Sequence, residues 1–321
     1  MSPRRRVFLL VGLAAAVASG VVVIGVLATR SNVPSVKPRR GSPPLALDLG
    51  LRTDPEARAL ERAQTLYDRD HDKARAKRIF EGYHSLEAQV GAAVAAWPSG
   101  TVARLETLAA ENPRSALVAL HLGFALYWSR REQDAVGAWR RAERLQPDSP
   151  YAVRAADFLH TRFAPGLPVF VPSFGAPPRI RSLSPLQQVA ALAAAARSDG
   201  ADTKILYGVV LQRLGRPRSA EKQFSAAARR EPSDPEARAA AAVGLFDKDN
   251  PALAFSRLGP LVRIFPHAQT VRFHLGLLLL WIAQVNKARE QLQTARAEAP
   301  NSALGREAAL YLAALRKVGT R

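Results

Sequence analysis

A 34-residue period in the second half of the chain constrains its fold more than any other feature. Proline closes the pattern at Pro232, Pro266 and Pro300. Small residues let two antiparallel helices approach closely, larger apolar residues fill the space between them, and proline ends the second helix. Counting back from each proline by fixed offsets gives such residues on a first and then a second helix: Gly208, Ala242 and Gly276; Ala220, Ala254 and Ala288; Phe224, Leu258 and Leu292; Ala227, Leu261 and Ala295.

The same pattern occurs earlier in the chain. Pro113 and Pro147 are again 34 residues apart, and small and large residues fall at the expected points of the unit that Pro147 closes. The stretches 121–128 and 274–281 both begin His-Leu-Gly and end in Trp, at equivalent points of a first helix. This echo indicates an internal duplication. Residues 54–81 predict two further helices that act as a degenerate repeat or cap.

The period, the small positions and the closing proline resemble the tetratricopeptide repeat, a helix–turn–helix unit. The resemblance covers residues 84–147 and 201–300, and residues 54–81 more loosely. It implies an all-α, right-handed α-α superhelix of helical hairpins. With the flanking sequence, it divides the chain into a basic N-terminal tip (1–6), a transmembrane helix (7–28), a proline-rich tether (29–53), an N-terminal repeat block (54–163), a proline-rich apolar insertion (164–182) and a C-terminal repeat block with a capping helix (183–318).

Residues 7–28 form an uncharged, apolar run of 22 residues. A helix of this length spans about 30 Å, the thickness of a bilayer's hydrocarbon core. The alternative is a cleaved signal peptide with its cleavage site at residues 26–28, but such peptides have apolar regions of only about 7–15 residues. We therefore expect a retained, single-pass anchor. Basic residues flank it almost equally, and Arg4 to Arg6 favour a cytoplasmic N-terminus with the repeats outside the cytoplasm.

Two stretches lack helical character. Residues 31–53 contain four prolines among glycine, serine and basic residues, which is typical of a semi-extended tether. Residues 164–181 contain five prolines, which exclude a helix, yet residues 167–174 are too apolar for an ordinary solvated loop. We consider two interpretations of residues 167–174. They lie across the protein's own groove until a partner segment displaces them, or they form a static loop wedged between two repeat blocks.

Residues that carry chemistry are sparse. The chain has no cysteine, its six histidines lack metal-ligand spacing, and no glycine-rich phosphate loop or Gly-x-Ser-x-Gly motif occurs. The sequence therefore predicts no enzyme, no cofactor and no metal site. His121 and His274 occupy one repeat position, which favours a role in packing or in an inter-repeat hydrogen bond over a catalytic role.

The formal net charge of +19 is compatible with anionic lipid, nucleic acid or an acidic partner. Residues 1–53 carry +7 of it, from eight basic residues and one acidic residue, and the remaining +12 is scattered along the repeats. Nucleic-acid binding calls for basic residues focused on one face or interleaved with stacking aromatics. The scattered pattern argues against it.

In the tetratricopeptide family the first helices line a concave groove, which usually binds an extended peptide or a helix of a partner. The lysine and asparagine pattern that clamps a C-terminal carboxylate in some members is absent here. The alternative is that these apolar residues are simply core. By register, the predicted groove residues are Leu120, Phe124, Tyr127, Trp128, Ile205, Val209, Gln212, Arg213, Phe246, Phe273, Leu277 and Trp281.

The resemblance implies a membrane-tethered scaffold or adaptor that holds a protein partner, in assembly or quality control within a bacterial envelope. The alternative functions are a subunit of an enzyme or secretion complex on the cytoplasmic face, or a basic nucleic-acid-binding repeat protein. A fold alone does not distinguish these functions.

Overall fold

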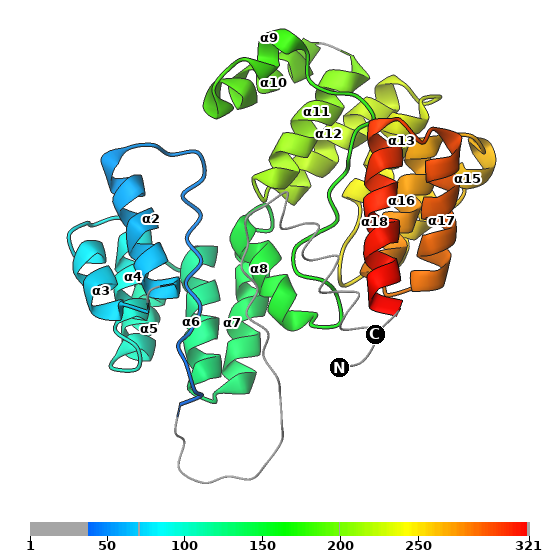
Figure 1. Ribbon diagram of the computed structural model, residues 1–321. Helices are drawn as coiled ribbons and strands as arrows, with labels where there is room; N and C mark the ends of the chain where they lie inside the picture. The colour runs from blue at the N-terminus through cyan, green and yellow to red at the C-terminus, as the bar shows by residue number, and fades with distance from the viewer. Residues whose placement is uncertain (1–37, 70, 199, 320–321) are drawn as a thin grey trace. The chain divides into compact units, whose positions relative to one another are not determined.

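The computed structural model describes residues 38–69, 71–198 and 200–319, and each regular element in these ranges is an α-helix. The all-α prediction is therefore confirmed (Figure 1). The chain divides between Leu159 and His160 into two compact units, the N-terminal unit and the C-terminal unit. Each unit consists of tetratricopeptide-like helical hairpins around its own hydrophobic core.

The described residues of the N-terminal unit form three hairpins and a final helix. Side-chain caps start several of these helices: the Asp54 carboxylate accepts from the Ala57 N–H at 2.9 Å, and Pro55 occupies the first helical position. The helices are α2 (Pro55–Asp68), α3 (Lys73–Phe80), α4 (Leu86–Ala95), α5 (Thr101–Glu111), α6 (Ala116–Trp128), α7 (Glu132–Leu145) and α8 (Pro150–Leu159).

The C-terminal unit repeats this plan after two additional helices. Its second hairpin has a broken second helix, since Gly259 and Pro260 separate α14 from α15. The helices are α9 (Pro178–Arg181), α10 (Pro185–Ser198), α11 (Ala201–Arg213), α12 (Pro217–Arg230), α13 (Pro235–Gly244), α14 (Ala252–Leu258), α15 (Leu261–Ile264), α16 (Gln269–Trp281), α17 (Val285–Glu298) and α18 (Ala303–Gly319).

Close packing within the hairpins follows the predicted pairing of small and large residues. A Cβ atom at Gly123 would lie 2.4 Å from the Trp139 ring, and one at Gly208 would lie 2.4 Å from the Phe224 ring. In both hairpins the glycine on the first helix leaves room for an aromatic side chain from the second. The predicted roles of the small and large positions are confirmed at these two hairpins.

The N-terminal segments give a different result from the hairpins. The basic tip and the predicted transmembrane helix at residues 7–28 lie outside the described residues. Among the helices that are described, none has the length and apolar character needed to cross a bilayer. Residues 38–53 belong to the predicted tether, yet Leu45 is 4% exposed and is part of the core of the N-terminal unit.

Candidate functional site

Each unit binds an extended segment of the chain that precedes its first hairpin. We call residues 38–50 the first strap and residues 164–177 the second strap. Leu45 and Phe170 anchor the straps in the two hydrophobic cores, with exposures of 4% and 0%. We call the side chains of a unit that contact its strap the strap-binding face. They lie mainly on the first helices of the hairpins, where the family resemblance predicts a groove.

The first strap is held through its backbone by α2 and α6 (Figure 1). The Leu47 N–H donates to Gln64 Oε1 at 3.4 Å, and Gln64 Nε2 donates to the Leu45 carbonyl at 3.3 Å. Between them, the Ala46 N–H donates to His121 Nε2 at 3.0 Å. These bonds satisfy main-chain groups that have no helix partner.

Two tyrosine hydroxyls bind the first strap on either side of residues 45–47. The Tyr67 hydroxyl donates to the Pro43 carbonyl at 2.6 Å, and the Asp48 N–H donates to the Tyr151 hydroxyl oxygen at 3.0 Å. Tyr67 is 4% exposed, and burial raises the pKa of its hydroxyl. The Tyr67 hydroxyl is therefore a neutral hydrogen-bond donor at neutral pH.

The second strap uses the same residue types on α11 and α16. The Phe170 N–H donates to Gln212 Oε1 at 2.9 Å, and Gln212 Nε2 donates to the Pro168 carbonyl at 3.4 Å. The Val171 N–H donates to His274 Nε2 at 3.0 Å. The Phe170 ring stacks on the His274 ring at 4.2 Å with an angle of 13° between the planes.

Charged groups contact the second strap near its two ends. The Glu236 carboxylate accepts from the Ser173 N–H at 2.6 Å and from the Ser173 hydroxyl at 3.0 Å. Glu236 is 8% exposed, and burial raises the pKa of its carboxyl group. The Lys248 ammonium, on a residue 2% exposed, donates to the Ala164 carbonyl at 2.9 Å. The second strap therefore meets a carboxylate where the first strap meets a phenol.

The two histidines are neutral hydrogen-bond acceptors toward the straps. Nδ1 of His121 lies 2.8 Å from the Leu117 carbonyl, and Nδ1 of His274 lies 2.7 Å from the Thr270 carbonyl. Because a carbonyl only accepts, Nδ1 carries the proton and Nε2 is left to accept from the strap. Complete burial lowers the pKa of each imidazole to about 4.

The two straps also share a sequence pattern of ten residues. Residues 41–50 read GSPPLALDLG and residues 166–175 read GLPVFVPSFG. Glycine stands at positions 1 and 10, proline at position 3, and leucine or phenylalanine at positions 5 and 9. The side chains at positions 3 and 5 are buried in both straps, and the N–H groups at positions 6 and 8 donate to the unit in both. The glycine at position 1 has φ of +86° or +80°, which favours glycine over other residues.

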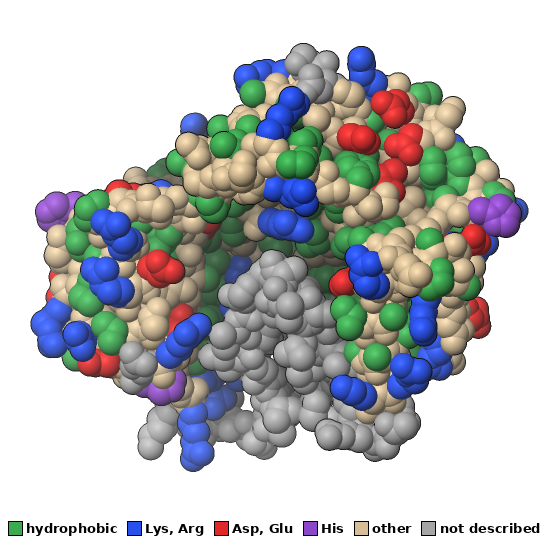
Figure 2. All heavy atoms as spheres, turned by 45° about the horizontal axis from the view of Figure 1, so that its top comes forward, with side chains coloured by type: hydrophobic (Ala, Val, Ile, Leu, Met, Phe, Trp, Pro, Cys, Tyr) green, Lys and Arg blue, Asp and Glu red, His purple; other side chains and the backbone are tan. Residues whose placement is uncertain are grey.

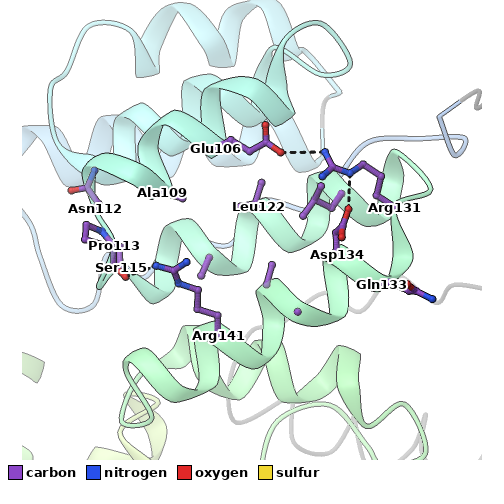
Figure 3. A pocket seen from close by; sticks show the side chains of 14 residues that line it. Glu106, Ala109, Asn112, Pro113, Ser115, Leu122, Arg131, Gln133, Asp134 and Arg141 are labelled. Carbon is purple, nitrogen blue, oxygen red and sulfur yellow. Dashed lines mark hydrogen bonds and ion pairs between the residues drawn. The ribbon is translucent and has the colours of Figure 1, made fainter.

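A separate hollow on the N-terminal unit has a volume of about 440 Å³ and lies among α5, α6 and α7 (Figure 3). Arg131 bridges Glu106 at 3.1 Å and Asp134 at 2.8 Å along its wall. The side chains of the N-terminal strap-binding face are not among those that line it. It is an open depression between successive hairpins, with an exposed ion-pair network.

Neither the charge on the visible face nor metal-ligand chemistry in the described residues marks another site. Lysine and arginine side chains are scattered among hydrophobic and acidic ones on the face shown in Figure 2. Within the described ranges, no group of three or more His, Cys, Asp or Glu side chains is arranged to hold a metal ion. The strap-binding faces are therefore the candidate site.

Comparison with known proteins gives structural similarity alone. No protein-family model matches the sequence, and no curated protein matches it. The chain is similar to YrrB, described as a TPR protein with an unusual peptide-binding site, at 17% identity over 64% of this chain and 97% of that one, with a TM-score of 0.31. It is also similar to yeast Tom70, at 11% identity over 87% of this chain and 68% of that one, with a TM-score of 0.33.

A third similar structure is the TPR2AB domain of yeast Sti1 in complex with pHSP90. It shares 12% identity over 81% of this chain and 98% of that one, with a TM-score of 0.31. These neighbours are helical-repeat structures with low TM-scores. The functional conclusions below therefore depend on the geometry of this chain.

The twelve predicted groove residues fall into three groups. Three of them bond to a strap. Gln212 binds the second strap. In the first strap, Arg39 donates from Nε to the Tyr127 carbonyl at 3.0 Å and from its N–H to the Trp128 carbonyl at 2.7 Å. Arg213 is exposed and is not among the residues that bind the strap through the bonds above. The remaining residues are buried: Leu120, Phe124, Ile205, Val209, Phe246, Phe273, Leu277 and Trp281.

Sequence reasoning did not assign His121, His274, Gln64 or Glu236 to a binding surface. The two histidines were predicted to pack or to form an inter-repeat hydrogen bond, whereas in the structure their Nε2 atoms accept hydrogen bonds from the straps. The signal that could have found this role is the ten-residue pattern shared by the straps, read together with the shared repeat position of the histidines.

Proposed function

We propose that this chain is an interaction scaffold that binds an extended segment of a partner protein on each strap-binding face. The observation that supports this function is that both faces already bind extended polypeptide through its backbone. Gln64, His121, Gln212 and His274 bond to N–H and carbonyl groups, which every polypeptide provides. A surface that binds main chain in this way offers the same hydrogen-bonding groups to a foreign extended segment once its own strap is displaced.

The test is to empty the C-terminal strap-binding face and then refill it. Residues 165–178 are replaced in the full chain by a flexible Gly/Ser linker of the same length, which keeps the two units connected. Without Phe170, buried apolar surface becomes accessible, so we expect stronger fluorescence from a dye that binds hydrophobic surface. A labelled synthetic peptide spanning residues 164–178 should then bind saturably and reverse the dye signal.

The matched control carries a Gly/Ser replacement of residues 299–302, a turn outside both straps, and should not bind the peptide. Circular dichroism establishes that both variants retain their helices. A folded linker variant that neither binds the dye more strongly nor binds the peptide would contradict the proposed function.

We further propose that residues 7–28 tether this scaffold to a membrane, with the N-terminus in the cytoplasm and the repeats outside. The support is the uncharged run of 22 residues and the preceding Arg4 to Arg6. A reporter enzyme that is active only outside the cytoplasm, fused after Arg321, tests the orientation. Activity supports this topology, and inactivity of an expressed fusion favours a cytoplasmic-face role.

A further inference from the structure

We propose that both strap-binding faces select the same motif in a partner: proline, any residue, leucine or phenylalanine, and then alanine or valine, in extended conformation. A partner segment with this motif docks by replacing the strap. The inference rests on the proposed function and adds the sequence that the site selects. The straps provide two independent examples of that sequence within one chain.

The side-chain part of the selection comes from positions 3 and 5 of the ten-residue pattern. Pro43 and Pro168 are buried at position 3, and Leu45 and Phe170 are buried at position 5. A spacing of two residues places both side chains on the same side of an extended chain. Proline suits a buried position here because it has no N–H that would need a partner.

The backbone part of the selection comes from the residues that follow. At position 6, the Ala46 N–H donates to His121 and the Val171 N–H donates to His274. At position 8, the Asp48 N–H donates to Tyr151 and the Ser173 N–H donates to Glu236. The side chains at position 8 are half-buried or exposed, and they differ in kind. Position 8 is therefore recognised through its main chain, and its side chain is free to vary.

When a partner segment replaces a strap, the contacts that are lost and the contacts that are formed are of the same kind. A segment with the same motif offers the same apolar side chains and the same N–H groups, so the number of bonds to the unit is unchanged. The strap's advantage is its covalent attachment, which acts as an effective concentration in the millimolar range for a short flexible link. A single substitution that weakens one strap therefore allows the peptide selectivity of its strap-binding face to be measured.

The experiment uses the full chain with Phe170→Ala, which removes the position-5 side chain of the second strap. A labelled peptide with the sequence of residues 166–175 is titrated by fluorescence anisotropy. We expect it to bind Phe170→Ala at least tenfold more tightly than the unsubstituted chain. A peptide with alanine at the motif proline and phenylalanine should bind at least tenfold more weakly, because both buried side chains are lost.

Two further variants locate the binding. Adding His274→Ala to Phe170→Ala removes the acceptor for position 6 and should weaken the peptide, whereas adding His121→Ala, on the other unit, should not. If Phe170→Ala disturbs folding, Gly166→Ala loosens the second strap instead, because Gly166 has φ of +80° and alanine is strained there, and it leaves the side chains of the strap-binding face unchanged. A peptide with the sequence of residues 41–50 should compete with the labelled peptide.

The outcomes separate the motif from the proposed function. If the alanine-substituted and scrambled peptides bind as tightly as the motif peptide, extended polypeptide binds without selection and the motif inference is overturned. If no peptide binds although dye shows the face to be open, both are overturned. If Phe170→Ala instead forms dimers that the motif peptide does not dissociate, the occupant is a second copy of the chain and the inference is also overturned.

Discussion

The two strap-binding faces perform the same task with different chemistry at their edges. Each has a glutamine that pairs with two backbone groups and a buried histidine that accepts an N–H. Around this common centre, the N-terminal face uses the hydroxyls of Tyr67 and Tyr151, whereas the C-terminal face uses Glu236 and Lys248. The centre determines that an extended chain binds and contains the histidines that respond to pH, and the edges differ in the charge that they present to the strap.

The two glutamines bond to different positions of the ten-residue pattern. Gln64 bonds to positions 5 and 7 of the first strap, and Gln212 bonds to positions 3 and 5 of the second strap. Position 7 of the second strap is Pro172, which has no N–H to donate. The glutamine of the C-terminal unit therefore bonds two residues earlier in the pattern.

The largest expected effect is the loss of the buried anchor from each strap. Phe170→Ala should lower the free energy of unfolding of the C-terminal unit by about 3–5 kcal/mol, and Leu45→Ala should lower that of the N-terminal unit by about 2–4 kcal/mol. The phenylalanine loses more because its ring stacks on His274 and also lies 5.8 Å from the Phe224 ring. Hydrogen-exchange mass spectrometry measures each unit separately in the full chain.

The matched control is Leu310→Ala, which truncates a side chain on a residue 65% exposed and should change stability by less than about 0.5 kcal/mol. Equal losses in both units from either strap substitution would contradict the separate anchoring of the two straps.

Acidification provides the second prediction. Both histidines have a pKa of about 4 in the folded protein, against about 6.5 in an unfolded chain. The unfolded chain therefore binds more protons between these values, so the stabilisation is complete above pH 6.5 and is lost as the pH falls toward 4. Each histidine accounts for a loss on the order of 3 kcal/mol.

A carboxyl group opposes the histidine in each unit. The carboxyl group of Glu236 has a raised pKa in the folded protein, so over its own range protonation favours the folded state and opposes the effect of His274. In the N-terminal unit, burial raises the pKa of the Asp68 carboxyl group, which opposes the effect of His121 in the same way. Each unit should therefore lose less stability between pH 6.5 and 4 than its histidine alone would give, and a loss as large as the histidine effect would contradict this opposition.

The hairpins were predictable from the sequence, and the straps were predictable only in part. A helical pair leaves a 34-residue period with small residues at contact points, so residues 54–81 and 201–300 could be assigned to hairpins. An extended, proline-containing segment leaves no such period, because its partners lie far along the chain. Ala46 bonds to His121, 75 residues away, and the sequence around Ala46 alone is typical of a tether.

The candidate site was harder to predict for a related reason. An apolar residue on a first helix either contacts the strap-binding face or belongs to the core, and periodicity does not separate these cases. Phe124 and Ile205 are fully buried, whereas Gln212 binds the second strap. Polar residues on first helices were therefore better guides to the face than apolar ones.

The third prediction tests whether the hairpins beneath the two faces are packed alike. Gly123→Ala and Gly208→Ala should each destabilise their unit by about 1–3 kcal/mol, since the added methyl group would meet the Trp139 or Phe224 ring. Gly137→Ala on α7 is the control: no atom lies within 4 Å of an added Cβ, and alanine favours the helix by about 1 kcal/mol. Denaturant titration of the full chain measures all three variants.

The smallest expected effect is that of Glu236→Gln, which tests whether this carboxyl group opposes His274. The amide oxygen of glutamine still accepts from the Ser173 N–H, so stability at neutral pH should change by less than about 1 kcal/mol. The group that opposes His274 no longer titrates, so the C-terminal unit should now lose stability toward pH 4 more steeply than it does in the unsubstituted chain. If its profile is unchanged, Glu236 does not oppose His274. Hydrogen exchange of residues 164–177 across the pH range, in Glu236→Gln and in the unsubstituted chain, measures this difference.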